Sequence, residues 1–95
     1  MTRPVARIGD ADIVHCSPMV RAMGAPNVLV NGRPASCLGD LNTVHKFPAG
    51  KKCLPHAEPI FKGGPTVFCN GRPIGHIGDK TCTAVALGSE SVLAN

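Results

Sequence analysis

Short apolar runs that end in a polar turn are the main pattern along the chain. Val28-Leu29-Val30 runs into Asn31-Gly32, and Val67-Phe68-Cys69 runs into Asn70-Gly71. An Asn-Gly pair between apolar segments is the strongest short signal for a β-hairpin, because a type I′ turn needs two residues at positive φ. The pattern therefore predicts an all-β fold that contains at least two hairpins.

The segment after each turn is one copy of a repeat. Arg-Pro, four further residues and then Gly-Asp occur at 3–10, 33–40 and 72–79. Three copies with the same internal spacing predict three equivalent structural units. An ordinary meander with coincidental repeats is the alternative interpretation.

The first copy has no strand before it, but a matching segment stands at the other end of the sequence. Residues 88–95 align with residues 24–31 and stop at the turn asparagine. We therefore expect Val92 to Ala94 to pair with the segment that begins at Arg3. The result is one small domain, a closed, threefold pseudo-symmetric ring of β-hairpins without exposed sheet edges.

Composition supports this architecture and excludes others. The 95 residues include 11 Gly and 9 Pro, and the longest stretch free of both, residues 79–87, is too short for an average helix. A helical bundle and a membrane-spanning helix are thus excluded. With only three Phe and no Trp or Tyr, the core is thin. Such a small domain needs a staple, which can be a metal, disulfides or oligomerisation.

The cysteine count and the charge narrow the choice of staple. The number of cysteines is odd, and the first seven residues lack the apolar core of a signal peptide. We therefore expect synthesis in a reducing cytoplasm, which favours a metal over disulfides, with Cys37 and Cys69 as buried small hydrophobic residues. The net charge of +4 is concentrated locally only at Lys46, Lys51 and Lys52, which indicates a solvated loop rather than a nucleic-acid site.

Candidate metal ligands follow the Gly-Asp turns. His15 and His45 each lie five residues after the turn aspartate, the third loop offers Cys82, and the long middle loop adds His56. Three imidazoles and one thiolate form a tetrahedral zinc set that is closed and structural. Cys16 and Cys53 remain open as alternatives to Cys82 for the thiolate ligand. His76 lies at a strand position that favours packing or surface exposure.

Support for catalysis is weak. Cys16 or Cys53 beside a histidine could be drawn as a nucleophile pair, but a ligand or core role fits better. Three of the six carboxylates belong to Gly-Asp turns, which leaves no acid–base pair. We expect a protein that is not an enzyme.

At the repeats the sequence resembles the PAAR-repeat family, whose hallmark is Gly-x-Pro-x-Val-x-Val-Asn-Gly-x-Pro-Ala-Ala-Arg-x-Gly-Asp. Residues 24–40 match this stretch closely. The naming tetrapeptide is imperfect in all three copies, at 4–7, 34–37 and 73–76. The resemblance covers essentially the whole chain, so it implies a PAAR-repeat domain over residues 1–95 with no appended effector domain.

The resemblance also implies a role. PAAR proteins form a sharp cone on the trimeric β-helical spike of type VI secretion systems, and similar proteins tip the spikes of contractile phage tails. Carried over by position, the family's apical zinc would be held by His15, His45, His56 and Cys82. The implied partner is a VgrG-like or phage spike, with one tip per trimer.

Further expectations follow from that role. The tip would pierce a target membrane, could recruit effector proteins, and would not bind nucleic acid. It would be made in the cytoplasm and then exported or injected without a signal peptide, or would be part of a virion tail. The alternative function is a small zinc-dependent binding module for nucleic acid or another acidic ligand.

Overall fold

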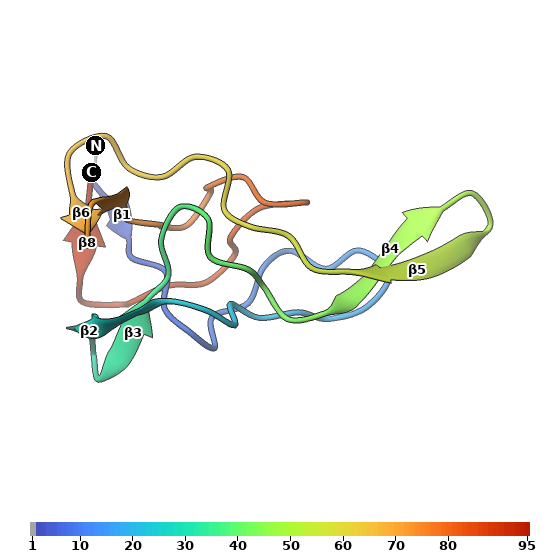
Figure 1. Cartoon of the computed structure of the whole chain (residues 1–95), viewed down its shortest axis with the longest axis horizontal. Helices are drawn as coiled ribbons and strands as arrows, with labels where there is room; N and C mark the ends of the chain where they lie inside the picture. Colours follow the sequence, from blue (N-terminus) through green and yellow to red (C-terminus); the bar gives the residue numbers. More distant parts are fainter. Residues whose placement is uncertain (1) are drawn as a thin grey trace.

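The computed structural model describes residues 2–95, in which all regular structure is β and no helix is present (Figure 1). The strands are short and pair two by two. Their bounds are β1 Arg3–Pro4, β2 Ala25–Val30, β3 Arg33–Ala35, β4 His45–Ala49, β5 Lys52–His56, β6 Phe68–Cys69, β7 Arg72–Pro73 and β8 Leu93–Ala94.

The three predicted strand pairs are present at one end of the molecule, which we call the base. They are β2 with β3, β6 with β7, and β8 with β1. In each pair the residue that ends the first strand faces the repeated arginine, as in Val30 opposite Arg33 and Cys69 opposite Arg72. At the turns Asn31 and Asn70 have φ of 54° and 53°, and the glycines that follow have 80° and 81°. Both central residues of each turn thus have the positive φ of a type I′ turn.

The ends of the chain meet at the base, as the sequence predicted. Arg3 pairs with Ala94 and Pro4 with Leu93, and the Val5 N–H donates to the Val92 carbonyl at 3.0 Å. Figure 1 shows β1 and β8 side by side, next to the two labelled ends. The C-terminal strand therefore completes the third unit of the ring.

A ring of three backbone hydrogen bonds joins the repeats where they meet. The Ala6 N–H donates to Gly75 at 2.8 Å, Gly75 donates to Ser36 at 2.9 Å, and Ser36 donates back to Ala6 at 2.9 Å. Each is the third residue of its tetrapeptide. The approach is so close that a Cβ on Gly75 would lie 2.5 Å from the Ser36 carbonyl oxygen and 2.6 Å from Ile60 Cδ1. The position therefore requires a small residue.

A second ring, of Arg–Asp ion pairs, explains the other repeated residues. The arginine of each copy reaches the Gly-Asp aspartate of a neighbouring copy. The pairs are Arg3 with Asp79 at 3.0 Å, Arg33 with Asp10 at 3.2 Å, and Arg72 with Asp40 at 2.7 Å. The sequence analysis assigned these aspartates to exit turns only. They also connect the units, because a buried carboxylate needs charged or N–H partners.

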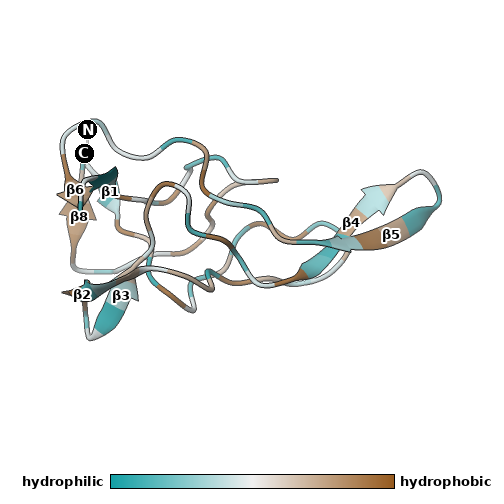
Figure 2. Cartoon of the chain, viewed as in Figure 1, coloured by the Kyte–Doolittle hydropathy of each residue, from teal (hydrophilic) through white to brown (hydrophobic). Residues whose placement is uncertain are grey.

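The long middle loop contains a fourth hairpin, β4–β5, where the sequence analysis expected a solvated loop. It runs in register from His45 opposite His56 to Ala49 opposite Lys52. It projects from the body at the end away from the base, and the molecule measures 40 × 25 × 23 Å (Figure 1). In Figure 2 this hairpin has short hydrophilic and short hydrophobic segments on both strands.

Candidate metal centre

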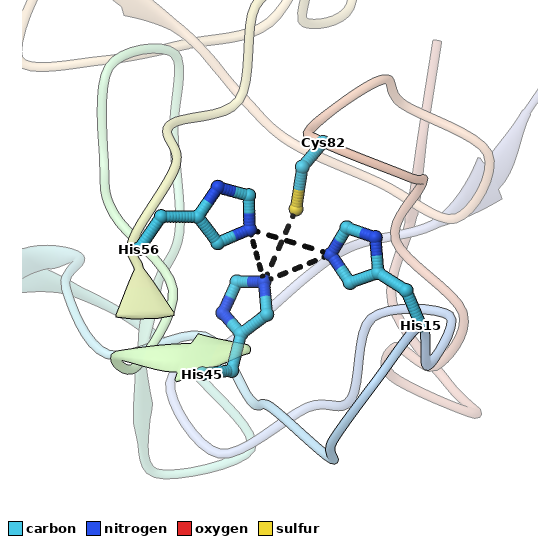
Figure 3. A group of neighbouring side chains, drawn as sticks. All are labelled: His15, His45, His56 and Cys82. Atoms are coloured by element: carbon cyan, nitrogen blue, oxygen red, sulfur yellow. Dashed lines mark hydrogen bonds between the residues drawn. The ribbon is translucent and has the colours of Figure 1, made fainter. Parts of the chain in front are cut away.

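Four side chains from three loops meet at the root of the β4–β5 hairpin (Figure 3). Their ligand atoms all lie within 4.8 Å of one another, and His45 is the buried member. They are His15, His45, His56 and Cys82.

The distances suit one tetrahedral ion. The three Nε2 atoms are separated by 2.8 Å between His45 and His56, 3.0 Å between His15 and His45, and 3.4 Å between His15 and His56. Cys82 Sγ lies 3.4 Å from His45 Nε2. Bonds of the usual zinc–nitrogen and zinc–sulfur lengths place tetrahedral neighbours roughly 3.3–3.6 Å apart. The set is therefore close to the geometry that a small divalent cation needs.

The β4–β5 register supplies two of the four ligands. His45 begins β4, His56 ends β5, and the two are register partners, so their side chains share one face of the hairpin. The Phe47 ring stacks on the His56 ring, with centroids 4.3 Å apart. Pairing at the root of the hairpin thus fixes the separation of two imidazoles before any ion binds.

A hydrogen bond prepares His45 for coordination through Nε2. His45 Nδ1 donates to the Thr43 carbonyl oxygen at 2.8 Å, which holds the ring proton on Nδ1 and leaves Nε2 free as a ligand. His56 Nδ1 lies 3.3 Å from the Glu58 carboxylate, so this ring turns Nδ1 toward a carboxylate and Nε2 toward the cluster. Burial, and then the nearby His45 and His56, lower the pKa of His15, which favours its neutral, metal-binding form. The sequence analysis did not identify Thr43 or Glu58, although Glu58 is only two residues from His56.

The remaining histidine lies outside this group. His76 is fully buried, and its Nδ1 lies 2.7 Å from Asp79 Oδ2. Of the two roles left open for it, packing is the one observed. Its burial and its carboxylate partner give it a structural role in the third repeat.

The cysteines depart from the sequence expectation. The structure contains two disulfides, Cys16–Cys53 and Cys37–Cys69, and among residues 2–95 only Cys82 is a free cysteine. The expectation that a metal is favoured over disulfides was therefore wrong, since two disulfides stand beside the metal-capable His/Cys group. Cys16 and Cys53 are removed as rival thiolates and as nucleophiles, because each sulfur is bonded to the other.

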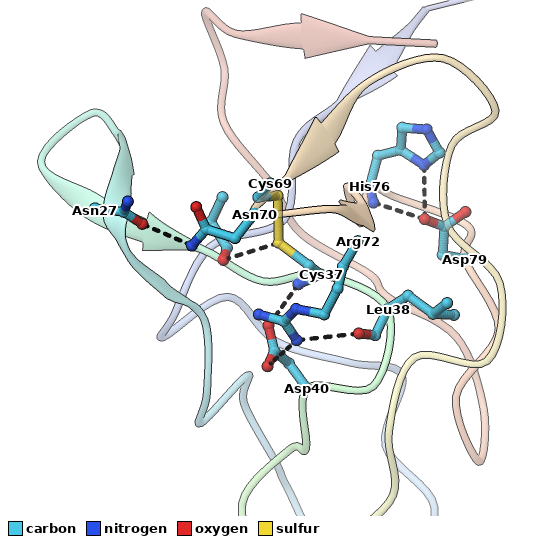
Figure 4. Close-up of a disulfide and its surroundings, with 10 residues drawn as sticks. Asn27, Cys37, Leu38, Asp40, Cys69, Asn70, Arg72, His76 and Asp79 are labelled. Atoms are coloured by element: carbon cyan, nitrogen blue, oxygen red, sulfur yellow. Dashed lines mark hydrogen bonds and ion pairs between the residues drawn. A yellow bond between two sulfur atoms is a disulfide. The ribbon is translucent and has the colours of Figure 1, made fainter.

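The pseudo-symmetry explains the second disulfide. Cys37 and Cys69 are both fully buried, as expected, but they are bonded to each other rather than packed separately (Figure 4). In the first repeat Arg7 occupies the position of Cys37, and its guanidinium donates to Asn31 on the neighbouring hairpin at 3.1 Å. The side chains of Arg7 and Cys37 thus both reach a neighbouring hairpin, and Cys37 meets there the cysteine that precedes the Asn70 turn.

Comparison with known protein families decides the relationship. The model of the PAAR motif family matches residues 23–86, which is more than half of the chain. The chain belongs to the PAAR motif family. PAAR proteins are structural spike-tip proteins of secretion systems and phage tails, so this chain is a spike-tip family member that has a metal-capable His/Cys group. The matched range includes His45, His56 and Cys82 but not His15.

A search of curated proteins found no match. Residues 2–95 also contain no helix long and apolar enough to cross a membrane.

Proposed function

We propose that this PAAR protein caps the trimeric β-helical spike of a type VI secretion system or a contractile phage tail, with one chain per spike trimer. The observation that carries the proposal is a set of three exposed apolar side chains at equivalent positions of the base. Leu29, Phe68 and Leu93 are 60%, 56% and 53% exposed. Each is the middle residue of the apolar run that leads toward its turn.

Threefold repetition makes this apolar set suitable for a trimer. Val67 and Val92 lie beside it and are also exposed, and Figure 2 shows hydrophobic colouring on β6 and β8. Exposed apolar surface of this kind marks an interaction site. A monomer with three equivalent faces can make the same contact with each chain of a symmetric trimer, so every favourable contact occurs three times.

The proposed metal is Zn²⁺, bound by His15, His45, His56 and Cys82. A donor set of three imidazoles and one thiolate suits zinc, and four protein ligands leave no open position for a substrate. Its role is therefore structural. It would tie the root of β4–β5 to the loops that hold His15 and Cys82.

The β4–β5 hairpin lies beyond this centre and away from the base, which supports its role as the leading end during passage through a target membrane. The proposed tip is not an enzyme and needs no nucleic acid. Effector recruitment and export without a signal peptide, through the contractile apparatus, belong to the same proposal.

Stoichiometry with the cognate spike tests the capping role. We expect native mass spectrometry to give one chain per three spike chains. Replacing Leu29, Phe68 and Leu93 together by Ser should abolish the complex without unfolding the protein. Val44→Ser is the matched control, since Val44 is 74% exposed but follows the Asp40 turn rather than lying on a base strand. A three-to-three complex, or salt-sensitive binding of duplex DNA with no spike complex, would refute the proposal and favour the binding-module alternative.

A further inference from the structure

A buried polar layer lies directly below the proposed metal centre. Asp12, Asn42 and Thr81 each follow a Gly-Asp aspartate by two residues, so they occupy equivalent positions of the three repeats. Each is only 2% exposed. The next residue in the third repeat is Cys82. The layer thus joins the repeat framework to the thiolate ligand.

The Asn42 side chain has a partner for every polar group. Its Oδ1 accepts from the Glu58 backbone N–H at 2.8 Å, and its Nδ2 donates to Asp12 Oδ2 at 3.0 Å. The second hydrogen of the amide points to Cys82 Sγ at 3.7 Å. A backbone N–H can only donate, so the Glu58 contact fixes which end of the amide is oxygen. Nδ2 must therefore face the sulfur.

Arg21 holds the other side of this layer. Its Nη2 lies 3.1 Å from Asp12 Oδ2, and neither side chain has any exposed area. The guanidinium also donates to the carbonyl oxygens of Asp40 at 3.2 Å and Glu58 at 3.3 Å. Burial lowers the pKa of Arg21, while the charges of Asp12, Cys82 and Asp40 oppose that shift. Arg21 therefore holds the same Asp12 oxygen that accepts from Asn42.

The other two repeats show that this ion pair is a local departure from the symmetry. The Gly9, Gly39 and Gly78 amides donate to the carbonyls of Arg21, Ile60 and Val85 respectively. The residues equivalent to Arg21 in the other two repeats, Ile60 and Val85, are thus apolar. A buried ion pair is weak evidence for stability, because the loss of solvation offsets most of its attraction. The pair occurs in one repeat, on the Asp12 oxygen that also accepts from Asn42, and Asn42 is the residue of the layer that contacts Cys82. This points to a role in orienting Asn42 toward the thiolate.

We propose that Asn42 is a positioning residue of the metal centre, which donates an N–H···S hydrogen bond to the metal-bound Cys82 thiolate and is itself oriented by the Asp12–Arg21 pair. The inference rests on the proposed metal site. A thiolate ligand keeps lone pairs that face the protein, and a fixed donor there orients the sulfur and withdraws negative charge from it. Loss of such a partner typically lowers metal affinity by about 10–100-fold.

Cadmium NMR tests the hydrogen bond in the unaltered chain. The zinc is replaced by ¹¹³Cd, and the side-chain amide protons of Asn42 are examined for scalar coupling to the metal through the sulfur. We expect a coupling on one of the two protons. A wild-type protein that binds cadmium but shows no such coupling overturns the inference.

A near-isosteric substitution tests the consequence. Asn42→Asp keeps the acceptor for the Glu58 N–H but removes both donor hydrogens. In the Co²⁺-loaded protein we expect the thiolate-to-cobalt charge-transfer band to move to longer wavelength, and metal affinity to fall by about 10–100-fold. Asn70→Asp is the matched control, because its amide donates to Asn27 at a base turn.

The outcomes separate the two proposals. If the wild-type chain binds neither Co²⁺ nor Cd²⁺, the metal site itself fails. If the wild type binds both and Asn42→Asp has an unchanged band and affinity, the metal site stands and the role of Asn42 is refuted. If Asn42→Asp does not fold, the cadmium coupling in the wild type decides.

Discussion

The base and the opposite end of the molecule are built on the same three repeats but use them differently. We call the opposite end, where His15, His45, His56 and Cys82 cluster, the metal end. At the base the units are nearly identical, and the glycines of the three Gly-Asp turns have φ of 91°, 88° and 90°. Only a few residues further along, equivalence is lost. His15 and His45 correspond to Ala84, Cys82 corresponds to Ile13 and Thr43, and His56 comes from the inserted hairpin.

The repeated part of the molecule forms a threefold surface, and the part that departs from the repeat forms the candidate metal centre. Repeated backbone hydrogen bonds and Arg–Asp pairs produce a threefold surface, which only a threefold partner can use fully. A tetrahedral ion has four ligands, so three equivalent loops cannot supply it without a fourth donor from elsewhere. The metal end therefore departs from the repeat. The inserted hairpin β4–β5 supplies two of the four ligands, His45 and His56, from the strand ends nearest the body.

Loss of the proposed metal should lower stability more than any other change and should loosen the metal end more than the base. Because structural zinc binding contributes on the order of 10 kcal/mol, His45→Ala or chelation should lower Tm by at least about 10 °C. Hydrogen exchange should accelerate over residues 43–57 more than in the base strands. Lys46→Ala is the control, since that side chain is exposed on the same strand. A chelated protein with unchanged Tm would contradict this prediction.

The next effect should come from the centre of the base. Gly75→Ala places a Cβ against the Ser36 carbonyl and Ile60, and should cost about 3 kcal/mol or more, at the upper end of overpacking penalties. Gly32→Ala has open space but a φ of +80°, so it should cost only about 1–2 kcal/mol. Urea unfolding measures both. Equal costs would show that the three-bond ring is not a tight contact.

The Arg–Asp ring tests the symmetry itself. Arg3→Met and Arg72→Met should each cost roughly 1–2 kcal/mol, because the arginines are partly exposed while their aspartates are buried. Arg33→Met should cost less, because Asp10 keeps Arg7 as a second partner at 2.9 Å. Urea unfolding measures the three costs, and an Arg33→Met cost as large as the other two would contradict this prediction.

The smallest effect should be loss of the Cys16–Cys53 disulfide while the metal is bound. The metal would already join His15 to His56, so the disulfide between nearby residues closes little additional loop. We expect the Cys16→Ser, Cys53→Ser double variant to lose less than about 1 kcal/mol with metal and about 3 kcal/mol without it. Thermal unfolding with and without chelator measures the difference. An equal loss in both states would refute this redundancy.

The sequence was sufficient for the parts of the fold that the repeat specifies. Two Asn-Gly turns, the register of the repeats and the pairing of β8 with β1 were all predicted, because each depends on local turn chemistry and identical spacing. The four clustered side chains were also named in advance. For these, the turn aspartates gave the offsets of His15 and His45, and the family resemblance gave the same set.

The features that the sequence did not reveal are a hairpin whose strand edges are unpaired and the contacts between different repeats. The Lys46–Lys52 segment was interpreted as a solvated loop, yet β4–β5 is an isolated pair whose outer edges need no donors, so Pro48 and Pro55 are tolerated in its strands. The disulfides and the Arg–Asp ring join residues from different repeats. Their partners become apparent only when the three units are arranged around the axis, and a linear comparison of the repeats does not show that arrangement.

Closure of the ring by the two ends of the chain has a consequence for how the protein is made. The Arg3–Asp79 ion pair spans 76 residues of sequence, and β1 cannot pair until β8 has been synthesised. Contacts of such high sequence separation form late in folding, because the intervening chain must first be ordered. A nascent chain that has not reached Ala94 therefore lacks one of the three faces, and the ring of hairpins closes only after that strand has been synthesised.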